Sequence, residues 1–170
     1  MTKFIYFEDE IEQEPISELI NSLQNLNDNV TDVELWFSTS GGSVIIMEYF
    51  TRVLNKLNEV KPIKIVFTFA VQSAGTELLT DYKGQIEFNN NLEYLMFHNS
   101  DRPVNLHSGD KKRTEALNNV IIEGNKNQLK KLKKLLTKKE RSKIKSGDQV
   151  YLYKKDFDRV LKWREEYLTK

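Results

Sequence analysis

Apolar and polar positions follow two different periods along most of the chain. Short apolar runs of strand length alternate with longer segments in which apolar residues recur three and four positions apart, as they do on one helix face. The helical spacing begins at Pro15, a residue suited to a first helical turn, and again at Ser43. The runs that predict strands are Phe4 to Phe7, Val33 to Phe37, Ile63 to Ala70, Gln85 to Phe88 and Tyr94 to Phe97. The alternation predicts a layered α/β domain.

The second half of the chain is dominated by one long helical pattern. A helix is predicted over about residues 110–137, with apolar residues near one stripe, and a C-terminal helix over about residues 154–169. Glycine and proline are too sparse for a flexible linker between domains. We therefore expect a single domain over residues 1–170, with its core in about residues 3–110 and 146–157.

Composition excludes several classes of protein. Apolar residues make up 39% of the 170 residues, which is enough for the core of one domain. The absence of cysteine excludes disulfides, thiolate nucleophiles and thiolate metal sites. No run approaches the roughly 18 apolar residues of a membrane helix and no signal-peptide stretch is present, so we expect a cytoplasmic protein with no membrane partner. His107 has no second ligand at metal spacing, so neither a metal nor a cofactor is expected.

The formal net charge of +1 conceals two segments of opposite sign. Residues 1–35 are acidic and residues 111–145 are strongly basic. Charge runs of this kind are usually solvated helix faces. They can also form an interface between copies, because opposite patches on one chain favour head-to-tail association into rings. Nucleic acid binding is disfavoured, since the basic stripe lacks interleaved aromatic residues.

Three short segments carry candidate chemistry. Ser73 lies between a predicted strand and a predicted helix start, where its hydroxyl would be exposed beside free helix amides. Gly41 and Gly42 end another strand, and glycines there let the backbone approach a ligand closely. His98 follows an apolar run and is a candidate base for a serine nucleophile. Taken singly, each signal is more often a helix cap, a plain turn or a strand-end histidine.

The order and spacing of these segments resemble the ClpP proteolytic subunits of the ClpP/crotonase superfamily, from about Lys3 to Phe157. Residues 38–44, Ser-Thr-Ser-Gly-Gly-Ser-Val, are similar to that family's Asn-Ser-Pro-Gly-Gly-Ser-Val segment. Residues 70–75, Ala-Val-Gln-Ser-Ala-Gly, are similar to its Ala-Ala-Ser-Met-Gly nucleophile turn, and residues 94–99 to the strand that carries its histidine. The resemblance implies a ClpP/crotonase-like α/β fold with stacked ββα units and a long handle-type helix.

The same resemblance implies a serine endopeptidase with a Ser-His-Asp triad. In this chain the family's roles fall on Ser73 as nucleophile, His98 as general base and Asp148 as the residue that orients the histidine. The backbone amides of Gly42 and Ala74 would form the oxyanion hole.

Substrate and partners follow from the resemblance as well. Gly41, Ser43 and Asn99 would contact a peptide or an unfolded protein, and the loop over residues 99–109 would flank the substrate groove. The family implies a homo-oligomeric ring or stacked rings, in which the long helix contacts another copy. It also implies a Clp-type ATPase as a partner, while the peptidase chemistry by itself needs no ATP.

Departures from the family pattern keep an alternative open. Val71 and Gln72 replace small residues before the nucleophile, Ala74 replaces methionine after it, and the family's terminal elements are absent. A catalytically impaired ClpP-like protein, which keeps the fold and assembly for binding or scaffolding, is therefore the second hypothesis. Acyl-CoA chemistry of the crotonase type is a third, disfavoured because those enzymes do not use a Ser-His pair at this spacing.

Overall fold

The structure is a computed structural model that describes residues 1–99 and 111–169. Its contacts divide the chain into two compact units, Met1–Phe97 with Tyr151–Lys170, and His98–Val150. The single domain expected over residues 1–170 stays a prediction.

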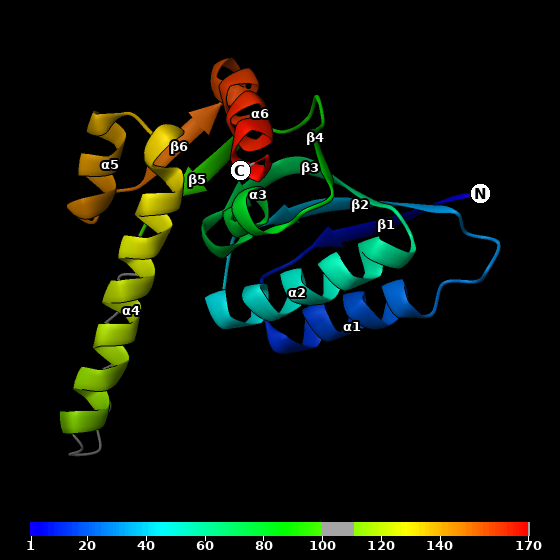
Figure 1. The fold of residues 1–170 in the computed structure, drawn as a ribbon, viewed down its shortest axis with the longest axis horizontal. Helices are drawn as coiled ribbons and strands as arrows, with labels where there is room; N and C mark the ends of the chain where they lie inside the picture. The colour runs from blue at the N-terminus through cyan, green and yellow to red at the C-terminus, as the bar shows by residue number, and fades with distance from the viewer. Residues whose placement is uncertain (100–110, 170) are drawn as a thin grey trace. The chain divides into compact units, whose positions relative to one another are not determined.

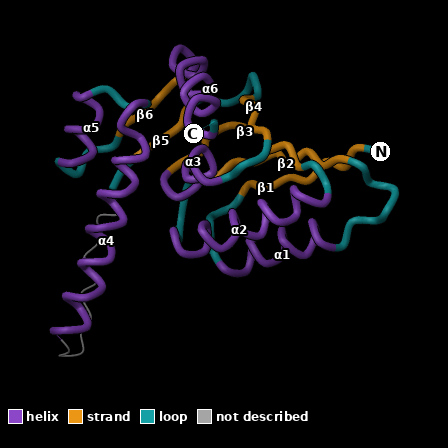
Figure 2. Tube along the Cα trace, in the orientation of Figure 1, coloured by secondary structure: helices purple, strands orange, loops and turns teal. Residues whose placement is uncertain are grey.

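The first unit is built on a largely parallel sheet (Figures 1 and 2). Its strands follow the order β1-β2-β3-β5-β6, and β4 pairs with β3 off this path. Strands β1, β2 and β3 pair in parallel, as β4 and β5 each do with β3. Their bounds are Thr2–Glu8 for β1, Asp32–Thr39 for β2, Ile63–Gln72 for β3, Gln85–Phe88 for β4, Tyr94–Phe97 for β5 and Val150–Tyr153 for β6.

Two amphipathic helices cover one face of this sheet (Figure 1). Helix α1 spans Gln13–Gln24 and helix α2 spans Val44–Val60. Phe37 is fully buried, with its ring centroid 5.1 Å from that of Phe7 on β1 and 6.4 Å from that of Phe50 on α2. Because side chains alternate across a strand, their neighbours on β1 and β2 point to the other face, where Tyr6 is 64% exposed.

Strand β3 changes partner midway along its length. Its first half pairs with β4, and its last residues, from Ala70 onward, pair with β5. The register between β2 and β3 shifts at this point, and Ser38 fills the irregularity by accepting a hydrogen bond from Ala70 N at 3.4 Å and donating to Ala70 O at 3.0 Å. Phe69 has a left-handed φ of 49° and is 50% exposed. Because of this bulge, β3 pairs first with β4 and then with β5, and it ends at Gln72, directly before Ser73.

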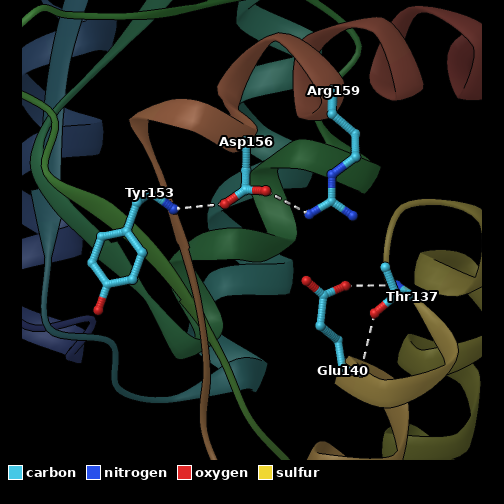
Figure 3. Close-up of polar contacts among 5 residues, drawn as sticks. All are labelled: Thr137, Glu140, Tyr153, Asp156 and Arg159. Atoms are coloured by element: carbon cyan, nitrogen blue, oxygen red, sulfur yellow. Dashed lines mark hydrogen bonds and ion pairs between the residues drawn. The ribbon is translucent and has the colours of Figure 1, made fainter.

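The C-terminal helix α6, Lys154–Leu168, belongs to the same unit. Figure 3 shows its start, where Tyr153 N donates to Asp156 Oδ2 at 3.2 Å and Asp156 Oδ1 is 3.0 Å from Arg159 Nη2. Arg164, only 6% exposed, donates from Nη2 to the carbonyls of Tyr82 and Gly84, each at 2.7 Å. Burial lowers the pKa of the Arg164 guanidinium to about 10. Arg164 thereby anchors α6 to the chain that follows the short helix α3, Leu78–Asp81.

In the second unit, the helix predicted over about residues 110–137 corresponds to α4 and the 3-10 turn that follows it. Helix α4 spans Lys111–Lys131, tightens into a single 3-10 turn over Leu132–Lys134, and is followed by a separate helix α5, Lys138–Lys145. Thr137 ends the first helical pattern because it caps α5: Glu140 N donates to Thr137 Oγ1 at 3.2 Å, and Thr137 N donates to Glu140 Oε2 at 2.6 Å (Figure 3). This capping box is present in the sequence as Thr-Lys-Lys-Glu.

Candidate active site

Ser73 stands in a backbone conformation that serine rarely adopts. Strand β3 ends at Gln72, and Ser73 opens the 3-10 helix η1, Ser73–Glu77, with a φ of +50°. A left-handed conformation costs a residue with a Cβ roughly 1–2 kcal/mol. Such strain persists only where the surrounding structure enforces it, and it gathers at functional sites. Here the enforced turn places a half-buried serine at the junction of strand and helix.

Gly41 lies directly against that serine. Gly41 has a φ of +106°, and a Cβ added there would lie 2.7 Å from Ser73 Cβ, 3.3 Å from Gln72 O and 3.4 Å from Ser73 Oγ. Both its backbone angle and its surroundings therefore require glycine. The glycine turn after β2 and the serine turn after β3 therefore meet at this point.

Gly42 is held in place by residues that precede α1. Ile11 forms an isolated parallel bridge with Gly42: Ile11 N donates to Gly41 O at 2.7 Å, and Ser43 N donates to Ile11 O at 2.9 Å. Since successive amides of an extended segment point to opposite sides, the Gly42 N–H points away from Ile11. No acceptor for that N–H occurs among residues 1–99 and 111–169. Gly42 thus offers a donor on the side opposite Ile11.

Thr39 was not identified from the sequence, yet it joins the two turns. Its buried hydroxyl accepts a hydrogen bond from Gly41 N at 3.0 Å. A Cβ added to Gly75 in η1 would lie 2.4 Å from Thr39 Cγ2, so this glycine permits close approach of η1 to β2. The sequence did hold a signal for this role: Thr39 is the last residue of a strand that leads into a glycine pair.

Ala74 and Ser43 supply helix-terminal groups. Ala74 is buried and is the second residue of η1, where a backbone N–H has no partner within its own helix. Ser43 is the N-cap of α2, since its hydroxyl accepts a hydrogen bond from Ile46 N at 3.4 Å. The amide of Ala74 can serve an oxyanion, while the Ser43 side chain already has a capping role.

The remaining predicted residues, His98, Asn99 and Asp148, belong to the second unit. His98 and Asn99 are half-buried just after β5, and Asn99 Nδ2 donates to Ile144 O at 3.0 Å. Within the described chain, the buried Asn99 Oδ1 has no hydrogen-bond partner. The proposed groove-flanking loop, with the exception of Asn99, lies outside the described residues, as does His107.

Asp148 is placed by the end of α5. Gly147 adopts a φ of +89°, Gly147 N donates to Ile144 O, and Asp148 N donates to Lys143 O at 3.0 Å. These bonds form the Schellman motif that closes many helices. The carboxylate of Asp148 is exposed and accepts a hydrogen bond from Ser146 Oγ at 3.3 Å. The helix ending therefore sets the backbone position of Asp148.

Two general features of the described chain bear on the chemistry. Residues 1–99 and 111–169 contain no group of three or more histidine, aspartate or glutamate side chains placed to hold a metal ion. Within the same ranges, no helix combines the length and the apolar character that crossing a bilayer requires.

Comparison with known proteins identifies the fold. No protein-family model matches the chain, and no curated protein matches it either. Among solved structures, the chain is similar to the crystal structure of the ClpP protease catalytic domain from Plasmodium falciparum, with a TM-score of 0.58 and 20% sequence identity. The match covers 93% of this chain and 80% of that one. The expected ClpP-like α/β fold is thereby confirmed.

Proposed function

We propose that this protein is a serine peptidase of the ClpP type. The observation that carries the proposal is Ser73, held at a left-handed turn against Gly41 at the end of β3. An exposed nucleophile on a strained strand-to-helix turn is how serine hydrolases present their hydroxyl beside free backbone amides. The structural likeness to a ClpP protease catalytic domain supports this proposal.

The proposed reaction is acyl transfer in two stages. Ser73 Oγ attacks the carbonyl carbon of a peptide bond while His98 takes the hydroxyl proton, and the N–H groups of Gly42 and Ala74 bind the oxyanion. The intermediate then collapses, the C–N bond breaks, and His98 returns the proton to the leaving amine. Water next attacks the acyl-serine with His98 again as base, which releases a carboxylic acid and restores Ser73. In this scheme Asp148 orients the imidazole.

The substrate in this proposal is a peptide or an unfolded protein. An extended chain would add as a strand near the glycine turn, because backbone groups at strand edges bind extended peptides without sequence preference. Gly41 and the backbone of Ser43 would lie along it, with Asn99 beyond His98. Asn99 Oδ1 supports this, since it is buried without a donor from residues 1–99 and 111–169, and a peptide N–H could donate to it.

Assembly is part of the same proposal. On α4, Val120 is 69% exposed and Ile122 is 50% exposed, and apolar side chains on a long helix gain free energy when another surface covers them. We infer that α4 contacts another copy in a cytoplasmic homo-oligomeric ring or stacked ring. A Clp-type ATPase would deliver unfolded protein substrates to such an assembly.

One observation favours a second candidate, a ClpP-like protein that binds or scaffolds without hydrolysis. Asp148 is exposed and its carboxylate bonds to Ser146 Oγ, whereas the aspartate of a triad is buried against its histidine. A protein that keeps the fold and assembly would not need Asp148 for any chemical step.

Labelling with a fluorophosphonate distinguishes the two candidates. The full-length protein is treated with the probe, and the adduct is counted by intact mass. We expect one adduct on the wild type and none on Ser73→Ala. Ser40→Ala is the matched control, because Ser40 is an exposed serine on the same turn with no proposed role. It should label as the wild type does.

Peptide hydrolysis by the same preparations completes the test. His98→Ala should slow hydrolysis by about a hundredfold or more, the usual contribution of a general base. Unchanged hydrolysis by Ser73→Ala would refute the peptidase. An assembled wild type that neither labels nor hydrolyses peptides would support the binding protein instead.

A further inference from the structure

A basic groove lies within the second unit, between α4 and α5. It has a volume of about 570 Å³, and six cationic side chains line it. Leu129 and Ser142 complete the lining, so the groove contains one hydroxyl and no carboxylate. The cationic residues are Lys126, Lys130, Lys133, Lys138, Arg141 and Lys145. None of them has a role in the proposed peptidase chemistry.

The six cations form two facing rows. Lys126, Lys130 and Lys133 are four and three residues apart along α4 and the 3-10 turn after it, and residues at this spacing share a helix face. The second row, from α5, follows the same rule with intervals of three and four residues. Each row extends for about 10 Å along its helix, from the rise per residue. The groove therefore presents positive charge from both walls over this length.

Little negative charge offsets these rows. From residue 126 to residue 145 the chain carries ten lysine or arginine side chains and a single carboxylate, that of Glu140. Glu140 is engaged in the capping box with Thr137 and does not line the groove (Figure 3). Like charges on facing walls destabilise the unit through mutual repulsion. A bound anion would relieve that repulsion.

Arg141 is fixed in place by the backbone. Its Nη1 donates to Lys133 O at 2.6 Å and also to Leu136 O. Nε and Nη2 of Arg141 donate to no atom of the described residues. These two nitrogens form the edge of a guanidinium that binds two oxygens of one phosphate side by side. The hydrogen bonds from Nη1 to the two carbonyls fix the orientation of the guanidinium in the absence of a ligand.

The stability of α4 and α5 explains only some of the cationic residues that line the groove. Lysines near the C-terminal end of α4, such as Lys130, interact favourably with the helix dipole. Lys126 lies 3.8 Å from Glu123, but both side chains are more than 60% exposed, so the pair contributes little. Neither effect explains Lys138, which stands at the start of α5, where the helix dipole disfavours a cation.

We propose that this groove binds a linear anion made of linked phosphate groups. Lysines and a bidentate arginine are the side chains that bind phosphate, and Ser142 adds a hydroxyl donor. No aromatic residue lines the groove, so it has no surface on which nucleobases could stack. Inorganic oligophosphate therefore fits these walls better than a single-stranded nucleic acid does.

The site does not depend on the peptidase hypothesis. All of its lining residues lie between Lys126 and Lys145, whereas the exposed apolar side chains of α4, Val120 and Ile122, come before that segment. Contact between copies through those apolar residues can coexist with anion binding in the groove.

Calorimetric titration of the full-length protein with inorganic tripolyphosphate tests the proposal. We expect saturable binding that weakens between about 50 and 200 mM salt, as charge-driven phosphate contacts do. Lys130→Gln/Lys145→Gln removes one cation from each wall and should weaken binding about tenfold or more. The matched control, Lys134→Gln/Lys139→Gln, removes the same charge from exposed positions outside the groove and should change the affinity less than about threefold.

Each remaining outcome counts for or against the groove. Arg141→Lys keeps the charge but loses the bidentate edge, and circular dichroism establishes that it is folded; a folded Arg141→Lys that binds more weakly supports the proposal. If both double variants weakened tripolyphosphate binding equally, binding would depend on overall positive charge and not on the groove, and the proposal would be overturned. Absence of saturable tripolyphosphate binding would also overturn it. So would tighter binding of an oligothymidylate or a polyglutamate peptide at matched charge.

Discussion

Gly41 lies so close to Ser73 that a Cβ on Gly41 would lie 2.7 Å from the Cβ of Ser73. Both residues have a positive φ, +106° for Gly41 and +50° for Ser73. A side chain at position 41 would clash with Ser73, so glycine at this position allows Ser73 to keep its left-handed φ. The pair therefore links the two turns on which the proposed oxyanion hole depends.

Gly41→Ala should strongly reduce the reactivity of Ser73. The added methyl cannot occupy its position without displacing Ser73 or the Gln72 carbonyl, and the left-handed angle adds about 1–2 kcal/mol of strain. We expect fluorophosphonate labelling to fall by at least about tenfold, because a small displacement of a nucleophile is costly to its rate. Labelling rates and circular dichroism, measured on the same sample, check this.

Gly124→Ala is the matched control. Gly124 lies inside α4, and a Cβ there would meet nothing within 4 Å. Alanine in an exposed helix interior is about 0.5–1 kcal/mol more favourable than glycine. We expect a slightly stabilised protein with unchanged labelling. Equal labelling by Gly41→Ala and Gly124→Ala would contradict the role of the Gly41 contact.

Ser73→Gly should be more stable than Ser73→Ala. At a φ of +50° alanine keeps the steric cost of a Cβ and glycine removes it, which predicts a difference of about 1 kcal/mol in the free energy of unfolding. Urea denaturation of the two variants measures this difference. The same pair of substitutions at Ser22, inside α1, should show the opposite sign, because glycine weakens a helix interior. The same sign at both positions would refute a strained Ser73.

Arg164→Ala should destabilise the first unit by about 2–4 kcal/mol. The substitution leaves the carbonyls of Tyr82 and Gly84 without their buried donor, and each unsatisfied buried group costs about 1–3 kcal/mol. Thermal and urea unfolding measure the loss. Lys162→Ala, at an exposed position of the same helix, should change stability by less than about 0.5 kcal/mol. Similar effects of the two variants would argue against the anchor.

Low pH should remove a small contribution that the Glu34 carboxylate makes to the free energy of unfolding. The hydrogen bond from Lys64, at 2.6 Å, holds the pKa of the Glu34 carboxyl below its usual range, although burial opposes this. Because the folded pKa lies below the unfolded value of about 4.3, Glu34 stabilises the protein above that pH, and the contribution disappears as the pH falls through the folded pKa.

Comparison of Glu34→Gln with the wild type across pH measures this contribution. We expect Glu34→Gln to be about 0.5–1 kcal/mol less stable at pH 7 and equal to the wild type at the acidic end. Glu48→Gln, exposed on α2, should match the wild type throughout. A difference for Glu34→Gln that persists at low pH would exclude the carboxylate as its cause.

Local patterns predicted most of the first unit. The strands over residues 85–88 and 94–97 have the predicted bounds, because short apolar runs between polar turns have few other ways to bury their side chains. The first three strands extend one or two residues beyond the predicted runs. Parallel pairing accounts for this, since hydrogen bonds of the ladder continue past the last apolar side chain.

The long helix, α4 with its 3-10 turn, ends at Lys134, a few residues before Thr137, for a local reason. Leucines continue at helical spacing through Leu135 and Leu136, so the pattern did not end at Lys131. The capping box of Thr137 and Glu140 ended it instead. The basic groove was not predicted, because it exists only where α4 and α5 face each other.

The sequence by itself determined the alternation of strands and helices, the ClpP-like fold and the positions of the candidate nucleophile and glycine turn. These features rest on interactions between residues that are near in the chain, or on motifs whose order is visible in it. The roles of Ser73, His98 and Asp148 stay predictions.

Three contacts were decided by the tertiary structure alone. Gly41 lies against Ser73, Thr39 connects the glycine turn to the serine turn, and Arg164 anchors α6. Each of these contacts joins segments far apart in sequence, and strand register and the β3 bulge set their separation. The packing of the whole sheet, which minimises buried voids and unsatisfied polar groups at once, is the physical reason that no local pattern could specify them.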